Sequence, residues 1–247
     1  MKLLLGLILI STITLGYSSC SDDIDPVDNY WASLVTINEI GGNSYDFTLD
    51  NGKKLWVKYP ADLNLNPKYE RGIIYYTVLE EQKEGYEHTI QLYRFYDVLT
   101  KGAIYIAEDD KVKQDSIGYD PIKVHSMWEA AGFLNISFGY NAGGNAAHML
   151  NLISNEEDLS VNKDVVKLEF RHNQSGDPQY YPADGYVSFD LTPYQTEGRD
   201  KVTFEITWKD FGGQIKTKEV EYKYGSAATQ AKTYTTLPED ITNLNIY

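Results

Sequence analysis

The sequence predicts an all-β protein in which a small β-barrel is followed by a β-sandwich. Runs of alternating polar and apolar residues recur along the chain, separated by short segments rich in Gly, Asn and Asp. Five or six of these runs fall within roughly 80 residues, which suits a small barrel, and about six more follow within roughly 110 residues, as in a sandwich. The chain has one cysteine, so no disulfide supports the fold and burial of apolar surface must do so.

Residues 1–19 have the pattern of a signal peptide. One positive charge, Lys2, precedes an apolar run over residues 3–15 that is too short to span a bilayer. Cys20 follows small serines, as in bacterial lipoprotein processing sites, where the cysteine sulfur is lipidated and becomes the first residue. An exposed free thiol would be a liability in an oxidising compartment, which favours lipidation over simple cleavage. Tyr17 departs from the small or aliphatic residue that is usual in such sites.

Residues 20–29 are acidic and aperiodic, which is typical of a flexible tether. Ser21, Asp22 and Asp23 resemble the acidic signal that exports Bacteroidetes lipoproteins to the outer face of the outer membrane. Several acyl chains on one cysteine anchor a protein stably, unlike a single chain. We therefore expect a folded body that is lipid-anchored in the outer membrane and faces the cell exterior.

The composition is strongly acidic. The precursor carries a formal charge of −14, and removing Lys2 leaves 21 Lys and Arg against 36 Asp and Glu, or −15. Phosphate backbones would repel such a body, so the sequence argues against nucleic acid as a partner. The 21 tyrosines suit half-buried strands, and they also suit surfaces that contact a glycan or another protein.

Residues 30–108 are expected to form the barrel. Asn51-Gly52 between two alternating runs is the strongest hairpin signal in this half, because both residues tolerate positive φ. The segment 60–69 holds two prolines and is predicted to be a loop. The expected strands are residues 31–37, 44–49, 53–59, 72–80, 86–99 and 103–107.

Residues 109–119 are polar, charged and weakly periodic, and we predict that they link the two domains. Within this segment, Asp115-Ser116-Ile117 matches the Asp-Ser/Thr-apolar pattern of Bacteroidetes O-glycosylation. An exposed linker is where such a modification is expected, so Ser116 is a candidate O-glycosylation site.

Residues 121–131 are the best candidate for a helix. Asp120 could cap it, Pro121 could take its first position and Gly132 could end it. The segment is short and begins with β-branched residues, so a strand is the alternative.

Residues 120–247 are expected to form the sandwich, with a poorly patterned tail over 225–247. The loop 173–184 contains two prolines and the adjacent Tyr180 and Tyr181. Because loops carry function on rigid scaffolds, these tyrosines are the candidate binding residues, unless they fold back as a small loop core. The expected strands are residues 133–140, 147–154, 165–172, 186–191, 202–209 and 214–222.

An ordered set of motifs resembles a known family. The motifs are Tyr30-Trp31, Trp128, Phe133-Leu134-Asn135-Ile136, His148, Asn151-Leu152, Leu168-Glu169-Phe170-Arg171-His172-Asn173 and Val187-Ser188-Phe189-Asp190-Leu191. Together they are similar to the NigD-like lipoproteins of Bacteroidetes over nearly the whole mature chain. The resemblance implies an OB-type barrel followed by a β-sandwich and an association with bacteriocin immunity. It implies no catalytic residues.

The sequence predicts no catalytic centre, metal site or cofactor. No nucleophile elbow G-x-S-x-G occurs, and Asp210-Phe211-Gly212 copies a kinase tripeptide on a predicted hairpin by coincidence. Residues 62–66 begin like a calcium loop, but Pro67 stands where glycine is needed. The histidines do not stand at metal-ligand spacing, and only the fold can decide whether those of the second domain meet. They are His88, His125, His148 and His172.

Three functions remain open. We expect a non-catalytic binding or structural role at the outer membrane, with a glycan or an envelope or extracellular protein as partner. The first alternative is a protective, bacteriocin-immunity type of envelope protein. The second is a hydrolase of surface polymers, which would need two carboxyl groups at a fixed separation. The sequence permits such a pair and does not show one, so we do not expect an enzyme.

Overall fold

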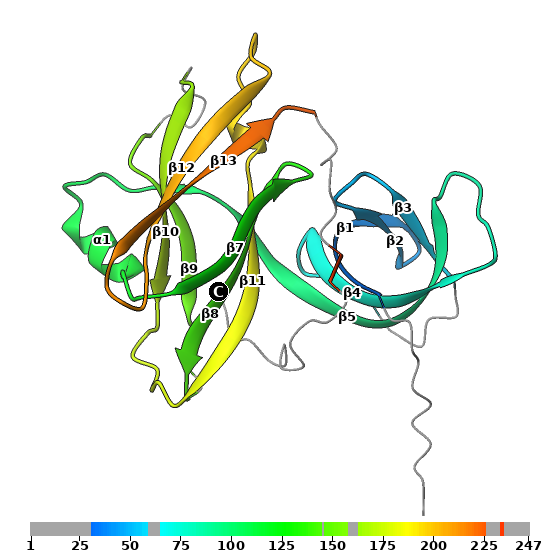
Figure 1. Ribbon diagram of the computed structural model, residues 1–247, viewed down its shortest axis with the longest axis horizontal. Coiled ribbons are helices and arrows are strands. Elements are labelled where there is room, and N and C mark those ends of the chain that lie inside the picture. The colour runs from blue at the N-terminus through cyan, green and yellow to red at the C-terminus, as the bar shows by residue number, and fades with distance from the viewer. Residues whose placement is uncertain (1–30, 59–64, 145, 158–162, 226–232, 235–247) are drawn as a thin grey trace, which may run out of the picture.

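The computed structural model describes residues 31–58, 65–144, 146–157, 163–225 and 233–234, and β-strands make up most of them (Figure 1). The predicted signal peptide, the lipidation site Cys20 and the export signal Ser21, Asp22 and Asp23 lie outside the described residues. Within the described part of the chain, no helix has the length and apolar character needed to cross a membrane. The prediction of an all-β protein with an OB-like barrel and a second β-domain is confirmed.

The first domain is a closed five-stranded barrel. Around the barrel, β1 pairs with β2, β2 with β3, β3 with β5, β5 with β4, and β4 returns to β1. Closure leaves the barrel without a free sheet edge along this ring, and the apolar side chains of alternate positions fill its interior. The strands are β1 (Trp31–Gly41), β2 (Ser44–Leu49), β3 (Lys54–Val57), β4 (Arg71–Leu79) and β5 (His88–Gly102).

The hairpin between β2 and β3 forms at the predicted Asn51-Gly52 turn. Gly52 has a φ of 82°, a left-handed conformation that glycine adopts without strain. Its N–H donates to the carbonyl of Leu49, at 2.8 Å, and closes the turn. The local sequence therefore determines this connection by itself.

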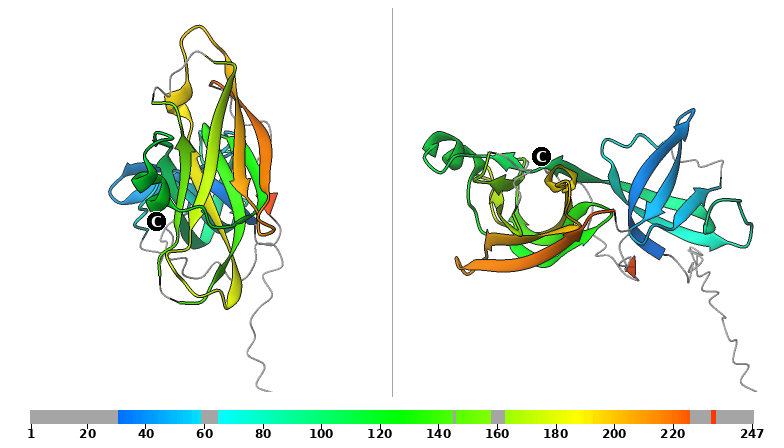
Figure 2. Two further views of the ribbon diagram at one scale, coloured as in Figure 1. Left: turned by 90° about the vertical axis from the view of Figure 1, so that its left-hand side faces the viewer. Right: turned by 90° about the horizontal axis from the view of Figure 1, so that it is seen from above.

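The chain passes from the barrel to the sandwich within β5. Residues 88–98 of β5 pair inside the barrel, whereas residues 99–102 pair in parallel with β11 (Tyr181–Asp190) of the second domain. The next strand, β6 (Ile104–Tyr105), already pairs with β9 (Met149–Ser154). The predicted last barrel strand, 103–107, therefore belongs to the sandwich. The crossing precedes the segment 109–119, because one continuous strand serves both domains (Figures 1 and 2).

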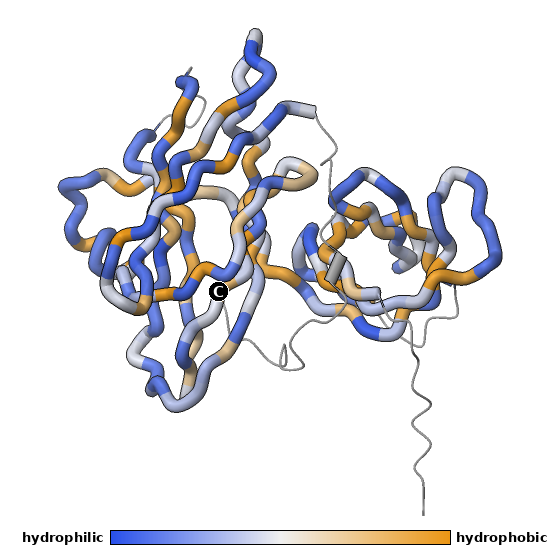
Figure 3. Tube along the Cα trace, viewed as in Figure 1, coloured by the Kyte–Doolittle hydropathy of each residue, from blue (hydrophilic) through white to orange (hydrophobic). Residues whose placement is uncertain are grey.

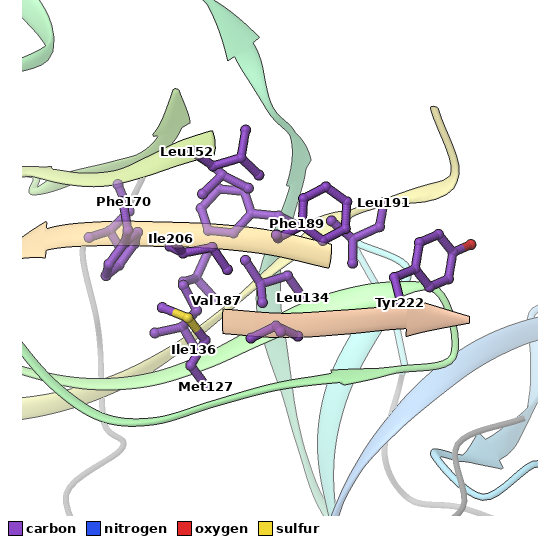
Figure 4. Close-up of a cluster of buried hydrophobic side chains, with 14 of the residues drawn as sticks. Met127, Leu134, Ile136, Leu152, Phe170, Val187, Phe189, Leu191, Ile206 and Tyr222 are labelled. Atoms are coloured by element: carbon purple, nitrogen blue, oxygen red, sulfur yellow. The ribbon is translucent and has the colours of Figure 1, made fainter. Parts of the chain in front are cut away.

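The second domain packs two sheets face to face. One sheet holds the end of β5, then β11, β8 (Phe133–Ala142) and β7 (Lys123–Ala130). The other runs in the order β13 (Ile215–Lys223), β12 (Lys201–Lys209), β10 (Val165–Asn173), β9 and β6. Apolar side chains of alternate residues point into the space between them, among them Ile136, Phe170, Phe189 and Ile206, which are all buried (Figure 4). Hydrophilic residues gather at the turns, and along the strands they alternate with hydrophobic ones (Figure 3).

Two predictions of local structure are wrong. The segment 109–119 contains α1 (Lys111–Ile117), because the Asp110 side chain accepts a hydrogen bond from the Lys113 N–H at 3.1 Å and caps the helix. The helix expected at 121–131 is wrong and the strand kept as its alternative is confirmed: Lys123–Ala130 form β7, in which Met127 and Ala130 are buried in pairing with β8. A bulge at residues 124–126 interrupts the alternation of buried and exposed residues, so the sequence pattern does not predict the strand.

The interface between the domains combines apolar packing with a buried ion pair. Ala32, Leu34, Ile73 and Val98 on the outside of the barrel are buried against the partly buried Trp128 and Tyr186 of the sandwich. Beside them, Arg71 Nη2 lies 2.6 Å from Asp50 Oδ1 and 3.3 Å from Asn135 Oδ1 of β8. Trp128, Phe133 and Asn135 of the sequence motifs therefore serve the contact between the domains, whereas Leu134 and Ile136 fill the core of the sandwich.

Candidate functional site

The predicted binding loop lies at one end of the sandwich, between β10 and β11. Residues 181–184 extend β11 by pairing with β8, so the irregular part of the loop, 174–180, is shorter than the predicted 173–184. The side chain of Tyr180 is 78% exposed and that of Tyr181 is 54% exposed. The alternative in which both tyrosines fold back into a loop core is therefore wrong, and both rings face solvent.

A small pocket opens beside this loop, with a volume of about 230 Å³. Its walls come from the segment before β7, from β8, from the end of β10, from the binding loop and from the turn between β12 and β13. The lining residues are Pro121, Asn141, His172, Gln174, Gln179 and Phe211. None of them carries a carboxylate, an ammonium or a guanidinium group, so this end pocket is lined by amides, rings and one imidazole.

The three amides of the end pocket form a chain of hydrogen bonds. Asn141 Nδ2 donates to Gln179 Oε1 at 3.4 Å, and Gln179 Nε2 donates to Gln174 Oε1 at 2.6 Å. Each amide carries two N–H donors and an oxygen with two lone pairs, so the chain leaves both donors and acceptors unused at its ends. The pocket can therefore bind groups that both donate and accept hydrogen bonds.

Asp177 fastens the binding loop to the neighbouring turn between β8 and β9. Its buried carboxylate accepts hydrogen bonds from Gly143 N–H at 2.8 Å and Ala146 N–H at 3.3 Å. Burial by itself raises the pKa of Asp177. The hydrogen bonds and the contact with His148 lower the pKa by more than burial raises it, so the pKa lies below its ordinary value. A Cβ on Gly144 would lie 2.5 Å from Asp177 Oδ1, so only glycine admits the carboxylate here.

Two histidines of the second domain meet beneath the end pocket. His148 Nδ1 lies 2.8 Å from His172 Nε2, and the two rings lie edge to edge with planes 17° apart and centroids 5.0 Å apart. Both residues are 3% exposed. Burial is the main reason that the pKa of His172 falls from 6.5 to about 4, with a smaller contribution from His148. His172 is therefore neutral at physiological pH.

The other ends of the two imidazoles are also occupied. His148 Nε2 lies 3.3 Å from Asp177 Oδ2, and His172 Nδ1 lies 3.2 Å from the carbonyl oxygen of Pro121. We call Asp177, His148, His172 and the Pro121 carbonyl the histidine chain. It links the carboxylate that fastens the loop to two residues that line the end pocket.

The remaining histidines are separate from this chain. His125 pairs with Asp184 at 2.7 Å on the surface, and His88 starts β5 in the barrel. Among the described residues, no three His, Cys, Asp or Glu side chains group as a metal site would require.

The candidate glycosylation site lies on a helix and not in an extended linker. Ser116 is exposed on α1, and its hydroxyl donates to the Lys113 carbonyl at 2.8 Å. Its modification stays a prediction.

A larger cavity of about 490 Å³ lies between the domains. Its lining mixes both signs of charge, with Glu39, Glu70 and Asp190 facing Lys68 and Lys101. Lys101 Nζ already donates to the Leu150 carbonyl at 2.9 Å and to Asn151 Oδ1 at 2.8 Å. Burial lowers the pKa of this amine. The lysine therefore ties β5 to β9.

Sequence reasoning found the loop but missed the residues behind it. Asp177 is one acid among 36 in the sequence, and only the fold brings it to His148. Phe211, the middle residue of the kinase-like tripeptide, forms a wall of the end pocket. The one usable signal was the Gly143-Gly144 pair, since adjacent glycines permit a close approach of another group.

Both domains match known family descriptions. Residues 34–98 match the NigD-like N-terminal OB domain, and residues 104–222 match the NigD-like C-terminal beta sandwich domain. Comparison with curated proteins gives no match.

Solved structures from Parabacteroides and Bacteroides species share the fold over most of the chain. A protein of Parabacteroides distasonis, named as a candidate toxin-related protein, is 28% identical with a TM-score of 0.66 over 80% of this chain and 96% of its own. A NigD-like immunity protein of Bacteroides caccae is 22% identical with a TM-score of 0.63 over 78% of this chain and 97% of its own. A candidate lipoprotein of Bacteroides fragilis is 16% identical with a TM-score of 0.59 over 79% of this chain and 99% of its own.

Proposed function

The chain belongs to the NigD-like family. From this premise we propose that it is a lipid-anchored outer-membrane protein that binds a ligand and does not catalyse a reaction. The Cys20 lipidation pattern and the acidic residues after it support anchoring at the exterior face. The name of the Bacteroides fragilis relative supports the same lipoprotein assignment. The anchor would leave both β-domains outside the membrane, with the end pocket open to extracellular ligands.

One observation carries the binding role. Tyr180 and Tyr181 are exposed, and they directly follow Gln179, which lines the end pocket. Tyrosine rings supply a large, rigid contact area at a small entropic cost, and their hydroxyls add hydrogen bonds. The exposure of two adjacent tyrosine rings next to a pocket-lining residue therefore supports a ligand-contact surface at this end of the sandwich.

The chemistry of the end pocket favours a neutral glycan over a charged ligand. Sugar hydroxyls donate and accept hydrogen bonds, as do the amides of Asn141, Gln174 and Gln179. Phe211 and Pro121 supply apolar walls for the C–H faces of a sugar ring. A volume of about 230 Å³ suits one or two sugar units and not a folded partner. Hydrolysis of a glycan would need two carboxyl groups at the bond, which the lining does not offer.

Immunity-type protection is the second candidate. It is favoured by the name of the Bacteroides caccae relative, whose likeness to this chain supports a shared fold. In that role the exposed tyrosines would contact a toxin or its receptor in place of a glycan.

Crosslinking on living cells that carry the protein at its native level tests the proposal. The crosslinked material is analysed by mass spectrometry, and the purified mature chain is titrated with neutral oligosaccharides. Recovery of an outer-membrane glycan-uptake complex together with saturable oligosaccharide binding supports the proposed function. If no oligosaccharide binds and a deletion strain becomes sensitive to a toxin, the glycan proposal is wrong and the immunity role replaces it.

A further inference from the structure

The histidine chain contains more hydrogen bonds than two neutral imidazoles can supply. Its three contacts are Asp177 to His148, His148 to His172, and His172 to the Pro121 carbonyl. Both ends of the chain, a carboxylate and a carbonyl oxygen, can only accept. Each contact therefore needs an N–H proton from a ring nitrogen, which makes three protons. A neutral imidazole carries one N–H, so two neutral rings provide two.

We infer that the His148–His172 pair binds one proton more than two neutral imidazoles do, and that this shared proton holds the end pocket in its binding shape. The inference stands on the geometry of three contacts between 2.8 and 3.3 Å within a buried cluster. It assigns to these histidines the regulation of the proposed binding site by pH, and it depends on the proposed function for that consequence alone.

The neighbouring groups place the extra proton on His148. Asp177 stays a carboxylate, since the backbone N–H groups of Gly143 and Ala146 hold its charge. Burial keeps the pKa of His172 near 4, so this ring is neutral at pH 7 and uses its single N–H on the Pro121 carbonyl. His148 must then donate from both nitrogens, as an imidazolium ion beside Asp177.

The other groups that face the pair are consistent with one positive charge. From β8, the Tyr140 ring packs 4.7 Å from His148 and 6.1 Å from His172. Burial raises the pKa of Tyr140 to about 12, so it stays neutral. From the segment before β7, Asp120 adds a negative charge near His172 and accepts a hydrogen bond from the Gln174 N–H at 2.8 Å. Two carboxylates, Asp177 and Asp120, thus flank the pair.

The shared proton affects the end pocket through residues that line it. If the proton leaves, His148 Nδ1 and His172 Nε2 face each other with lone pairs, or His172 gives up its contact with Pro121. Both His172 and Pro121 line the pocket, while Asp177 fastens the loop that carries Gln174 and Gln179. If a second proton binds, two cations stand 5.0 Å apart. The binding shape therefore exists between these two limits of pH.

Nitrogen NMR of the histidine rings tests the proton count directly. The mature chain is labelled with ¹⁵N-histidine and titrated between pH 4 and pH 9. His88 and His125 lie outside the histidine chain. The variants His88→Gln and His125→Gln remove the signals of these two rings, so the remaining signals belong to the His148–His172 pair. We expect one ring with both nitrogens protonated and one neutral ring at pH 7. Two neutral rings in the folded wild type at pH 7 would overturn the inference.

Asp177→Asn removes the negative charge with the smallest change in side-chain size, although its amide can accept only some of the Asp177 hydrogen bonds. The amide keeps an oxygen for hydrogen bonding but removes the counter-charge, so we expect the pair to bind its extra proton at least tenfold more weakly. An unchanged titration in this variant would also contradict the inference. The NMR titration detects the extra proton without any ligand. A missing proton therefore contradicts the inference, whereas a failed glycan titration contradicts only the proposed function. Glycan binding that is constant from pH 5 to pH 9 would remove the regulatory role.

Discussion

Arg71 of β4 and Asp50 at the end of β2 form an ion pair of 2.6 Å, with their side chains 0% and 2% exposed. The pair lies where the barrel meets the sandwich, and Arg71 also reaches Asn135 of β8, which in turn accepts from Ser188 Oγ at 2.7 Å. Trp128 Nε1 lies 3.4 Å from the second oxygen of Asp50. These bonds hold the two domains together and fix the sandwich relative to the barrel.

We predict that Asp50→Asn strongly destabilises the whole chain. The change leaves the Arg71 charge buried without a counter-ion, which costs about 3–5 kcal/mol in the free energy of unfolding. Urea denaturation of the mature chain measures the loss. Glu87→Gln is the matched control, because Glu87 and its partner Lys53 are 43% and 47% exposed, and we expect a far smaller loss since water screens the pair. Equal losses for the two variants would contradict the structural role of the buried pair.

Gly72→Ala should destabilise the barrel by overpacking. A Cβ at this position would lie 2.6 Å from Cε2 of Phe95 and 3.1 Å from the Tyr96 carbonyl oxygen. Such crowding costs about 1–3 kcal/mol. Gly102→Ala is the control, because a Cβ there has no neighbour within 4 Å, and its effect should stay within about 0.5 kcal/mol. Thermal unfolding of both variants gives the comparison, and a stable Gly72→Ala protein would show that the strands move apart easily.

Acid should weaken the protein through His172. In the folded chain this ring stays neutral down to about pH 4, whereas in the unfolded chain it takes a proton near pH 6.5. The unfolded state therefore binds more protons between these values, and the free energy of unfolding falls as the pH drops, by about 3 kcal/mol in total. Urea denaturation at pH 7, 5.5 and 4 measures the slope.

His125→Gln should keep this acid slope, because His125 is partly exposed and pairs with Asp184 at the surface. His172→Gln should lose most of the slope. Should both variants show the slope of the wild type, another group must cause it.

Replacing the exposed tyrosines should affect binding and leave stability unchanged. Tyr180→Ala/Tyr181→Ala removes rings that are 78% and 54% exposed, so the free energy of unfolding should change by less than about 1 kcal/mol for the pair. Oligosaccharide affinity and crosslinked partner recovery should fall at least tenfold. Tyr105→Ala, on β6 and 39% exposed, is the control. Unchanged partner recovery by the folded double variant would end the assignment of this surface.

Ser116 is predicted to carry an O-linked glycan in the native host. It is exposed near the end of α1, so an enzyme can reach it without unfolding the domain. Intact-mass analysis of the native mature protein should show an added mass that Ser116→Ala removes. A native protein without added mass would exclude the modification.

Local patterns were sufficient for most of the strands. The Asn51-Gly52 hairpin and the alternation of Val166, Leu168 and Phe170 each encode an element within a few residues. The segment 121–131 failed as a helix because pairing with β8 and a bulge outweighed its helix-like ends. Helix α1 was missed because its capping residue, Asp110, sits in a charged run that resembles a linker.

By itself the sequence determined the class of fold, the order of the two β-domains, the lipoprotein signal pattern and the loop that ends at Tyr180, because each is encoded in neighbouring residues. Only the tertiary structure decided where one domain passes into the next, since β5 pairs in both. It alone brought Asp177 to His148 and His172, and Arg71 to Asp50 and Asn135. Those contacts join residues far apart in the chain, and their energies depend on burial, which exists only once the sheets have packed.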